Sequence, residues 1–196
     1  MEQIADYVNA LVNAKEELSS HSKEVSKLAY EFGIYLGLGL KDLNNLKVGG
    51  MIHDIGKVEI PEHILFKTDF LTDEEFELIK KHPLFGYEIL QRTKHSFSKD
   101  VLEIVLQHHE RMDGRGYPHK LKDKEINPLA KIVSLCDVFS AIINARSYKN
   151  SYSFEYALEE MKKGFGTQFD SELGEKFVQF MNQKYVNKIN QHMTIL

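Results

Sequence analysis

Histidines that stand beside other potential metal ligands are the most prominent chemical feature of the sequence. The chain contains nine histidines, and five have such neighbours: His21, His53, His82, His108 and His109. Three carboxylates accompany them: Glu17, Asp54 and Asp137. Imidazole and carboxylate both bind divalent metal ions, and this set is too large for one ion. It predicts two or three octahedral cations that share a bridging carboxylate, and the lack of a suitably placed cysteine favours iron or manganese over structural zinc.

The spacing of two of these carboxylates supports a metal site. Glu17 and His21 are four residues apart, so a continuous helix places them on one face. Asp137 lies between the apolar Cys136 and Val138 in a segment with helical periodicity. A buried carboxylate is costly unless it is paired or coordinated, so we expect Asp137 to have a positively charged partner.

The segments that carry these residues have the apolar spacing of α-helices. Val25 to Leu36 and Leu43 to Ile52 each present one apolar face, and Thr72 with Glu75 forms a capping-box pattern. Further helices are expected near residues 4–18, 84–90, 98–109, 128–143, 153–163 and 171–187, and residues 110–127 are expected to form a loop. The sequence thus predicts an all-α fold of about seven to nine helices.

Composition bounds the class of protein. The 196 residues suit a single domain, which we expect to span residues 1–196. A formal net charge of −4 argues against broad binding to nucleic-acid polymers or anionic membranes, although a local basic pocket for a small anion stays open. A single cysteine, no basic leader and no long apolar run indicate a cytoplasmic protein without a membrane span.

Several linked motifs resemble one known family, the HD-GYP subgroup of the HD phosphohydrolase superfamily. The resemblance extends from about Glu17 to Leu173. Because several motifs occur in the same order, this resemblance is far more specific than an isolated His-Asp pair. The motifs are His53-Asp54-Ile55-Gly56-Lys57, His82-Pro83, His108-His109-Glu110-Arg111 and Asp113-Gly114-Arg115-Gly116-Tyr117-Pro118.

The resemblance implies a metal-dependent phosphodiesterase that opens cyclic-di-GMP to linear pGpG, with GMP as an optional further product. The implied metal ligands are Glu17, His21, His53, Asp54, His82, His108, His109 and Asp137. Asp54 matches a carboxylate that bridges two metals, and retention of Glu17 matches members that hold three.

The resemblance also implies roles in substrate binding. Lys57 matches a lysine that touches the scissile phosphate, and Arg146 and Lys149 match residues that hold substrate phosphate. Tyr117 can pack on a substrate base or on a partner. The loop residues Arg111, Asp113, Gly114, Gly116, Tyr117 and Pro118 are linked in this family to substrate access and to partners such as a diguanylate cyclase or a regulatory domain.

Two alternatives and one departure accompany this interpretation. The chain can instead be a weakly catalytic cyclic-dinucleotide receptor or docking module, or a hydrolase of a related cyclic dinucleotide. The family usually has an aspartate three residues after Asp137, where this chain has Ser140. Serine brings no charge, so weaker tuning of the metal ligands and reduced activity are expected.

Overall fold

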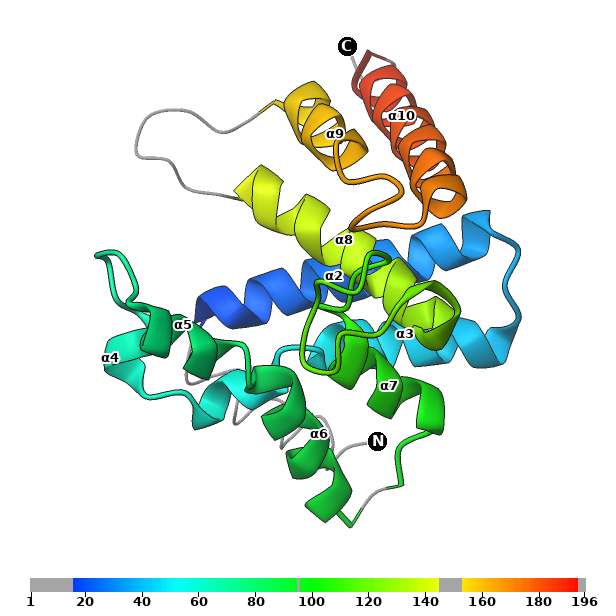
Figure 1. Ribbon diagram of the computed structural model, residues 1–196. Coiled ribbons are helices and arrows are strands. Elements are labelled where there is room, and N and C mark those ends of the chain that lie inside the picture. Colours follow the sequence, from blue (N-terminus) through cyan, green and yellow to red (C-terminus); the bar gives the residue numbers. More distant parts are fainter. Residues whose placement is uncertain (1–15, 95, 145–152, 194–196) are drawn as a thin grey trace.

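The computed structural model describes residues 16–94, 96–144 and 153–193. Most of these residues are in α-helices, as the apolar periodicity of the sequence predicts (Figure 1). Within those ranges the structure has isolated bridges but no strand, so the predicted all-α class is confirmed. The elements are α2 (Glu16–Tyr35), α3 (Leu40–Ile52), η1 (Ile55–Glu59), α4 (Glu62–Leu65), α5 (Asp73–Ile79), α6 (His82–Arg92), α7 (Lys99–Gln107), η2 (Asp123–Glu125), α8 (Pro128–Asn144), α9 (Phe154–Lys162) and α10 (Ser171–Met193).

Local capping signals begin the helices as predicted. Thr72 and Glu75 exchange side-chain and backbone hydrogen bonds in a capping box at the start of α5. The Ser98 hydroxyl accepts the Val101 N–H at the start of α7. The structure differs from the predictions in two ways: α10 continues to Met193, and the short elements η1 and α4 were not predicted. The helix predicted from residue 4 lies mostly outside the described residues.

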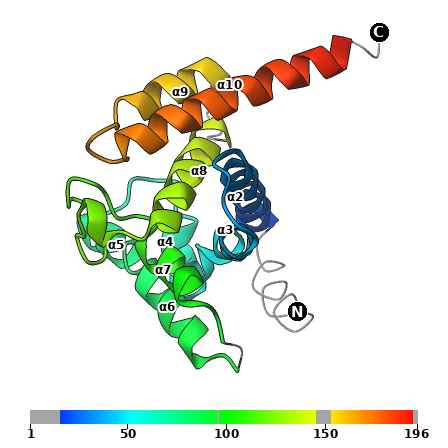
Figure 2. The same cartoon turned by 90° about the vertical axis from the view of Figure 1, so that its right-hand side faces the viewer.

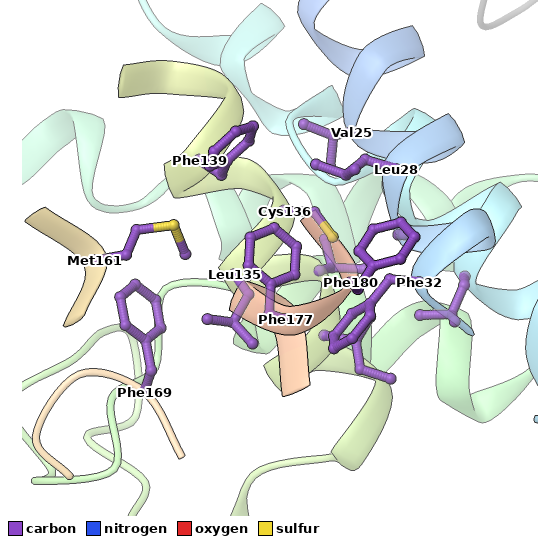
Figure 3. Close-up of a cluster of buried hydrophobic side chains, with 14 of the residues drawn as sticks. Val25, Leu28, Phe32, Leu135, Cys136, Phe139, Met161, Phe169, Phe177 and Phe180 are labelled. Atoms are coloured by element: carbon purple, nitrogen blue, oxygen red, sulfur yellow. The ribbon is translucent and has the colours of Figure 1, made fainter. Parts of the chain in front are cut away.

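The larger hydrophobic core surrounds α8. In Figure 1, α8 crosses α2, with α9 and α10 on one side and α7 on the other. Figure 3 shows Phe32 of α2 beside Phe177 and Phe180 of α10, and the Phe32 ring centroid is 5.1 Å from that of Phe177 and 5.3 Å from that of Phe180. These aromatic contacts, together with the burial of α8 residues such as Leu135, hold α2, α8 and α10 together.

A smaller apolar cluster joins α3, η1, α6 and α7 through Ile52, Ile55, Ile89, Leu90, Val101 and Val105. Helix α2 lies close to α3, because Gly50 has no side chain and a Cβ there would lie 2.9 Å from the Ser26 Cα. The Ser26 hydroxyl also donates to the Lys47 carbonyl, at 2.6 Å.

The view in Figure 2 shows α10 extending beyond the other helices. Among the described residues, no helix has the length and apolar character needed to cross a bilayer.

Candidate metal centre

Predicted metal ligands from five segments meet where α3, α6 and α7 begin or end. His53 and Asp54 form the turn between α3 and η1, His82 begins α6, and His108 and His109 follow the last residue of α7. His21 comes from α2 and Asp137 from α8. Their potential ligand atoms form two groups, in each of which all atoms lie within 4.8 Å of one another: Asp54, His82, His108 and His109 in the first group, and His21, His53 and Asp137 in the second.

The backbone fixes the orientation of three of these imidazoles in the same way. Each Nδ1 lies at hydrogen-bond distance from the carbonyl oxygen of the residue three positions earlier: 2.8 Å for His53, 2.8 Å for His82 and 2.9 Å for His108. A carbonyl only accepts, so each Nδ1 carries a proton. The Nε2 atom of a neutral ring is then left with its lone pair free, which is the form that binds a metal ion.

Asp54 belongs to the first group and also approaches the second. Its Oδ1 atom is 3.2 Å from His82 Nε2 and 3.9 Å from His108 Nε2, whereas its Oδ2 atom is 3.4 Å from His53 Nε2. The same Oδ2 accepts a hydrogen bond from the Lys57 ammonium, at 2.6 Å. One carboxylate oxygen therefore faces each group, as a bridging ligand requires.

Two buried atoms show that the site fits cations. His53 Nε2 and Asp54 Oδ1 have no hydrogen-bond partner among the described residues. In addition, His82 Nε2 and His108 Nε2 lie 3.2 Å apart while both Nδ1 atoms donate elsewhere. Two lone pairs that face each other at this distance repel. Two nitrogens bound to one ion at roughly 2.1 Å are about 3 Å apart, so a shared divalent ion removes the conflict.

The buried carboxylates of the site are stabilised in their charged form by neighbouring basic groups. Burial alone raises the pKa of Asp54, but Lys57 and His53 outweigh it and hold that pKa well below its ordinary value. Asp137 is likewise buried, and its hydrogen bond with His21 and its attraction to His53 keep its pKa well below the ordinary value. Burial lowers the pKa of His109 to about 3, so this ring is neutral at physiological pH.

Metal binding is expected to displace a proton from His53. Burial lowers the pKa of this ring, but Asp54 and Asp137 more than offset burial and raise it to about 10. The ring is therefore protonated below that pH in the metal-free protein, and a ligand must be neutral. At roughly pH 8, above the ordinary imidazole pKa, we expect manganese binding to release about one proton and to strengthen about tenfold per pH unit.

Calorimetry of manganese binding in buffers with different ionisation enthalpies measures this proton release. Replacing His53 with glutamine provides the control, since the variant has no imidazole proton to release at this position. A binding enthalpy that is independent of the buffer, together with an affinity that is independent of pH, would contradict the expectation.

Gly56 allows the turn that contains Asp54 to reach α6. A Cβ at this position would lie 1.9 Å from the His82 carbonyl oxygen and 2.4 Å from the Gly86 nitrogen. Both contacts involve backbone atoms, which cannot rotate away as a flexible side chain does. The absence of a side chain at Gly56 therefore sets the separation between Asp54 and His82.

The loop 110–127, called the GYP loop below, is held by Glu110, the residue that follows His109. The Glu110 carboxylate is buried and accepts the N–H groups of His119, at 2.6 Å, and Leu121, at 3.0 Å. Tyr117 packs its ring on His109, with the centroids 4.7 Å apart. The loop thus presents an aromatic side chain directly beside a candidate metal ligand.

Arg111 connects the same loop to the turn between α9 and α10. Its guanidinium binds both carboxylate oxygens of Asp113, at 3.1 and 2.9 Å, and donates to Gln168 Oε1, at 3.0 Å. The hydrogen bonds from Arg111 hold the pKa of Asp113 at about 2. The Asp113 N–H also donates to the Thr167 carbonyl. Arg111 and Asp113 therefore hold the loop in place.

A cavity of about 540 Å³ opens between the GYP loop and the turn before α6. Its lining carries the positively charged Lys80, Lys81, Arg115 and Lys120, against one acid that forms an ion pair with Lys80. Tyr117 also lines it, so one side chain contacts both the cavity and the metal centre. Sequence patterns did not predict this cavity, because its two walls are distant in sequence.

Some predicted site residues fall outside what the structure describes. Arg146 and Lys149 lie in the segment 145–152, which is not described, and only the backbone of Glu17 is described, within α2. Their assignments therefore stay predictions. Glu24, which accepts a hydrogen bond from Ser140, was not predicted as part of the site.

Comparison with known families agrees with this geometry. A family model described as HD domain matches residues 7–173. The chain belongs to the HD domain family. The resemblance predicted from the sequence motifs is thus confirmed, and the all-α HD fold is shared with the solved HDG"Y"P protein Bd1817 from Bdellovibrio bacteriovorus. That match has a TM-score of 0.69 and 27% identity, and it covers 86% of this chain and 52% of the solved one.

Curated members of the HD domain family extend the comparison. A "Cyclic di-GMP phosphodiesterase" from Thermotoga maritima is 34% identical over 177 residues, which cover 90% of this chain and 48% of the relative. A "3'3'-cGAMP-specific phosphodiesterase 2" from Vibrio cholerae is 31% identical over 182 residues, which cover 93% of this chain and 35% of the relative. The chain therefore spans about half or less of the length of these relatives.

Proposed function

We propose that this HD domain is a metal-dependent phosphodiesterase that hydrolyses cyclic-di-GMP. The observation that carries the proposal is the pair of adjacent His/Asp groups that Asp54 connects. Each group contains one buried ligand atom without a hydrogen-bond partner among the described residues, Asp54 Oδ1 in the first and His53 Nε2 in the second. The proposed ligands are Glu17, His21, His53, Asp54, His82, His108, His109 and Asp137, with iron or manganese as the ions. We extend the domain over residues 1–196, with its motifs at about 17–173.

When bound, two or three divalent ions would activate water and polarise the phosphoryl oxygens. The protein residues supply positioning and charge. Lys57 lies at the edge of the centre, and its attraction to Asp54 outweighs burial and raises its pKa, so the ammonium stays charged. We propose that it binds a phosphate oxygen of the substrate, where it would offset negative charge that develops in the transition state.

The basic cavity suits the remainder of an anionic dinucleotide. Tyr117 offers an aromatic surface at the boundary between cavity and metal centre, and burial raises the pKa of its phenol, which keeps it neutral. Aromatic rings stack on nucleobases without strong base preference. Arg115 and Lys120 are exposed on the same loop. From the family resemblance, we also propose this loop as the contact for a diguanylate cyclase or regulatory domain. Arg146 and Lys149 complete the proposed phosphate contacts.

The deciding experiment measures turnover by the purified, manganese- or iron-loaded chain under anaerobic conditions. We expect linear pGpG from cyclic-di-GMP, identified by chromatography, and no product from protein treated with a chelator. 3'3'-cGAMP is assayed in parallel, because the Vibrio cholerae relative is named for that substrate. Faster turnover of cGAMP would replace the proposed substrate. Tight binding of either dinucleotide without turnover by the loaded protein would favour a receptor instead.

A further inference from the structure

His21 is oriented differently from the other histidines of the centre. The Nδ1 atoms of His53, His82 and His108 face backbone carbonyls, whereas the Nδ1 atom of His21 lies 3.1 Å from the Ser140 hydroxyl. The Nε2 atom of His21 lies 2.8 Å from Asp137 Oδ1, inside the second ligand group. The Ser140 side chain on α8 therefore orients the His21 ring, whereas backbone carbonyls orient the other three rings.

The Ser140 hydroxyl is in turn bound by a carboxylate on α2. Ser140 Oγ donates to Glu24 Oε2, at 3.1 Å. Asn144, one turn later on α8, donates to the same Glu24 oxygen and, at 3.0 Å, to the Ser140 carbonyl. Glu24 and His21 are three residues apart on α2, so they share one helix face. The result is a continuous connection from His21 through Ser140 to Glu24.

Counting protons along this connection fixes the form of His21. A hydroxyl has one proton to donate and two lone pairs to accept with. A carboxylate can only accept, so the one Ser140 proton points to Glu24. Ser140 must then accept from His21 Nδ1, which therefore carries a proton. His21 Nε2 faces Asp137 Oδ1, which also only accepts, so in the metal-free protein Nε2 carries a proton there as well. Because Nδ1 keeps its own proton for Ser140, Nε2 is the nitrogen whose proton a bound ion would replace.

We propose that Glu24 is a positioning residue that acts through Ser140 to hold His21 in its metal-binding tautomer and orientation. This inference rests on the proposed metal centre. The inference also changes what we expect of Ser140. Ser140 lacks the negative charge of the aspartate that the family usually has at this position, and Glu24 supplies that charge from the far side of the Ser140 hydroxyl. The connection supports the group formed by His21, His53 and Asp137.

The first test uses metal-free protein and does not depend on activity. Nitrogen NMR of ¹⁵N-histidine-labelled chain distinguishes a protonated Nδ1 from a protonated Nε2. In the wild type we expect a protonated Nδ1 on His21, and in Glu24→Gln a loss of that proton, because an amide can donate to Ser140 and so frees the Ser140 hydroxyl to donate to Nδ1. Glu31→Gln is the matched control, since Glu31 lies on the same helix but pairs with Lys184 and Lys27.

The second test titrates manganese into the same proteins and follows free Mn²⁺ by electron paramagnetic resonance. Loss of an outer partner of a metal-binding histidine typically weakens metal affinity about ten- to a hundredfold. We expect that loss for one ion in Glu24→Gln, with no change in Glu31→Gln. The double variant Glu24→Gln/Ser140→Asp should regain the affinity, because its carboxylate lies directly beside His21 Nδ1.

An unchanged His21 tautomer and unchanged manganese affinity in Glu24→Gln would overturn the inference, and so would a loss that the double variant does not rescue. The two proposals can fail separately. If the wild type binds no manganese, the metal centre is wrong, whereas the tautomer measurement still decides whether Glu24 controls His21.

Discussion

Replacement of Asp54 with asparagine is expected to lower hydrolysis of cyclic dinucleotide by about a thousandfold or more. Asp54 Oδ1 faces His82, and Oδ2 faces His53, so one residue serves both ligand groups. Asparagine keeps the shape but replaces one oxygen with an amide nitrogen that cannot bind a cation. A bridging ligand contributes to metal activation worth several kcal/mol, and each 1.4 kcal/mol corresponds to a factor of ten in rate.

The measurement combines steady-state turnover with metal analysis of the same preparation. We expect metal content to fall together with activity, while circular dichroism keeps its helical signal. Asp69→Asn is a suitable control, since Asp69 is exposed in the segment between α4 and α5 and lies outside both ligand groups. Near-normal activity and metal content in Asp54→Asn would refute the bridging assignment.

Replacement of Gly56 with alanine is expected to destabilise the fold by about 3 kcal/mol or more and to weaken metal binding. The added methyl group would meet backbone atoms of His82 and Gly86 at distances far below van der Waals contact. Excess volume in a packed interior typically costs about 1–3 kcal/mol, and rigid backbone on the opposing side places this case at the upper end. Relief of the clash moves η1 away from α6, which separates Asp54 from His82.

Denaturant unfolding of Gly56→Ala and wild type, followed by manganese titration below the transition, tests this prediction. Gly39→Ala provides a matched comparison, because a Cβ at Gly39 meets nothing within 4 Å and its φ of −72° is accessible to alanine. We expect Gly39→Ala to change stability by less than about 1 kcal/mol. Equal stability of the two alanine variants would show that η1 and α6 can separate without cost.

The sequence predicts those parts of the fold that depend on neighbours in the chain. The capping box at Thr72 and Glu75 involves two residues three positions apart, so its pattern is visible before folding. Helical periodicity places most helices for the same reason. Element η1 was not predicted, because five residues hold too little periodicity to distinguish a 3₁₀ turn from a loop.

For the candidate site, the residue types could be predicted from the sequence, whereas their arrangement in space could not. The types of the ligands follow from motifs, but their division into two groups depends on contacts such as that between His21 and Asp137, which are 116 residues apart. The role of Glu24 could not be predicted, since an exposed glutamate on a helix has no local signal that distinguishes it from other surface acids. The basic cavity likewise requires the α5–α6 turn and the GYP loop to meet.

The position of His53 and His108 at helix ends has an electrostatic consequence. His53 follows the last residue of α3, and His108 follows the last residue of α7. The peptide dipoles of a helix sum to roughly half a negative charge at its C-terminal end, which attracts cations. Two helix dipoles therefore direct their negative ends at the place where the imidazoles converge, whereas α6, which begins at His82, directs its positive end there. The two negative ends outnumber the single positive end, so the three helix ends together favour cations. The backbone itself supplies attraction for positive charge there, and fewer acidic side chains are needed to hold cations in a buried site.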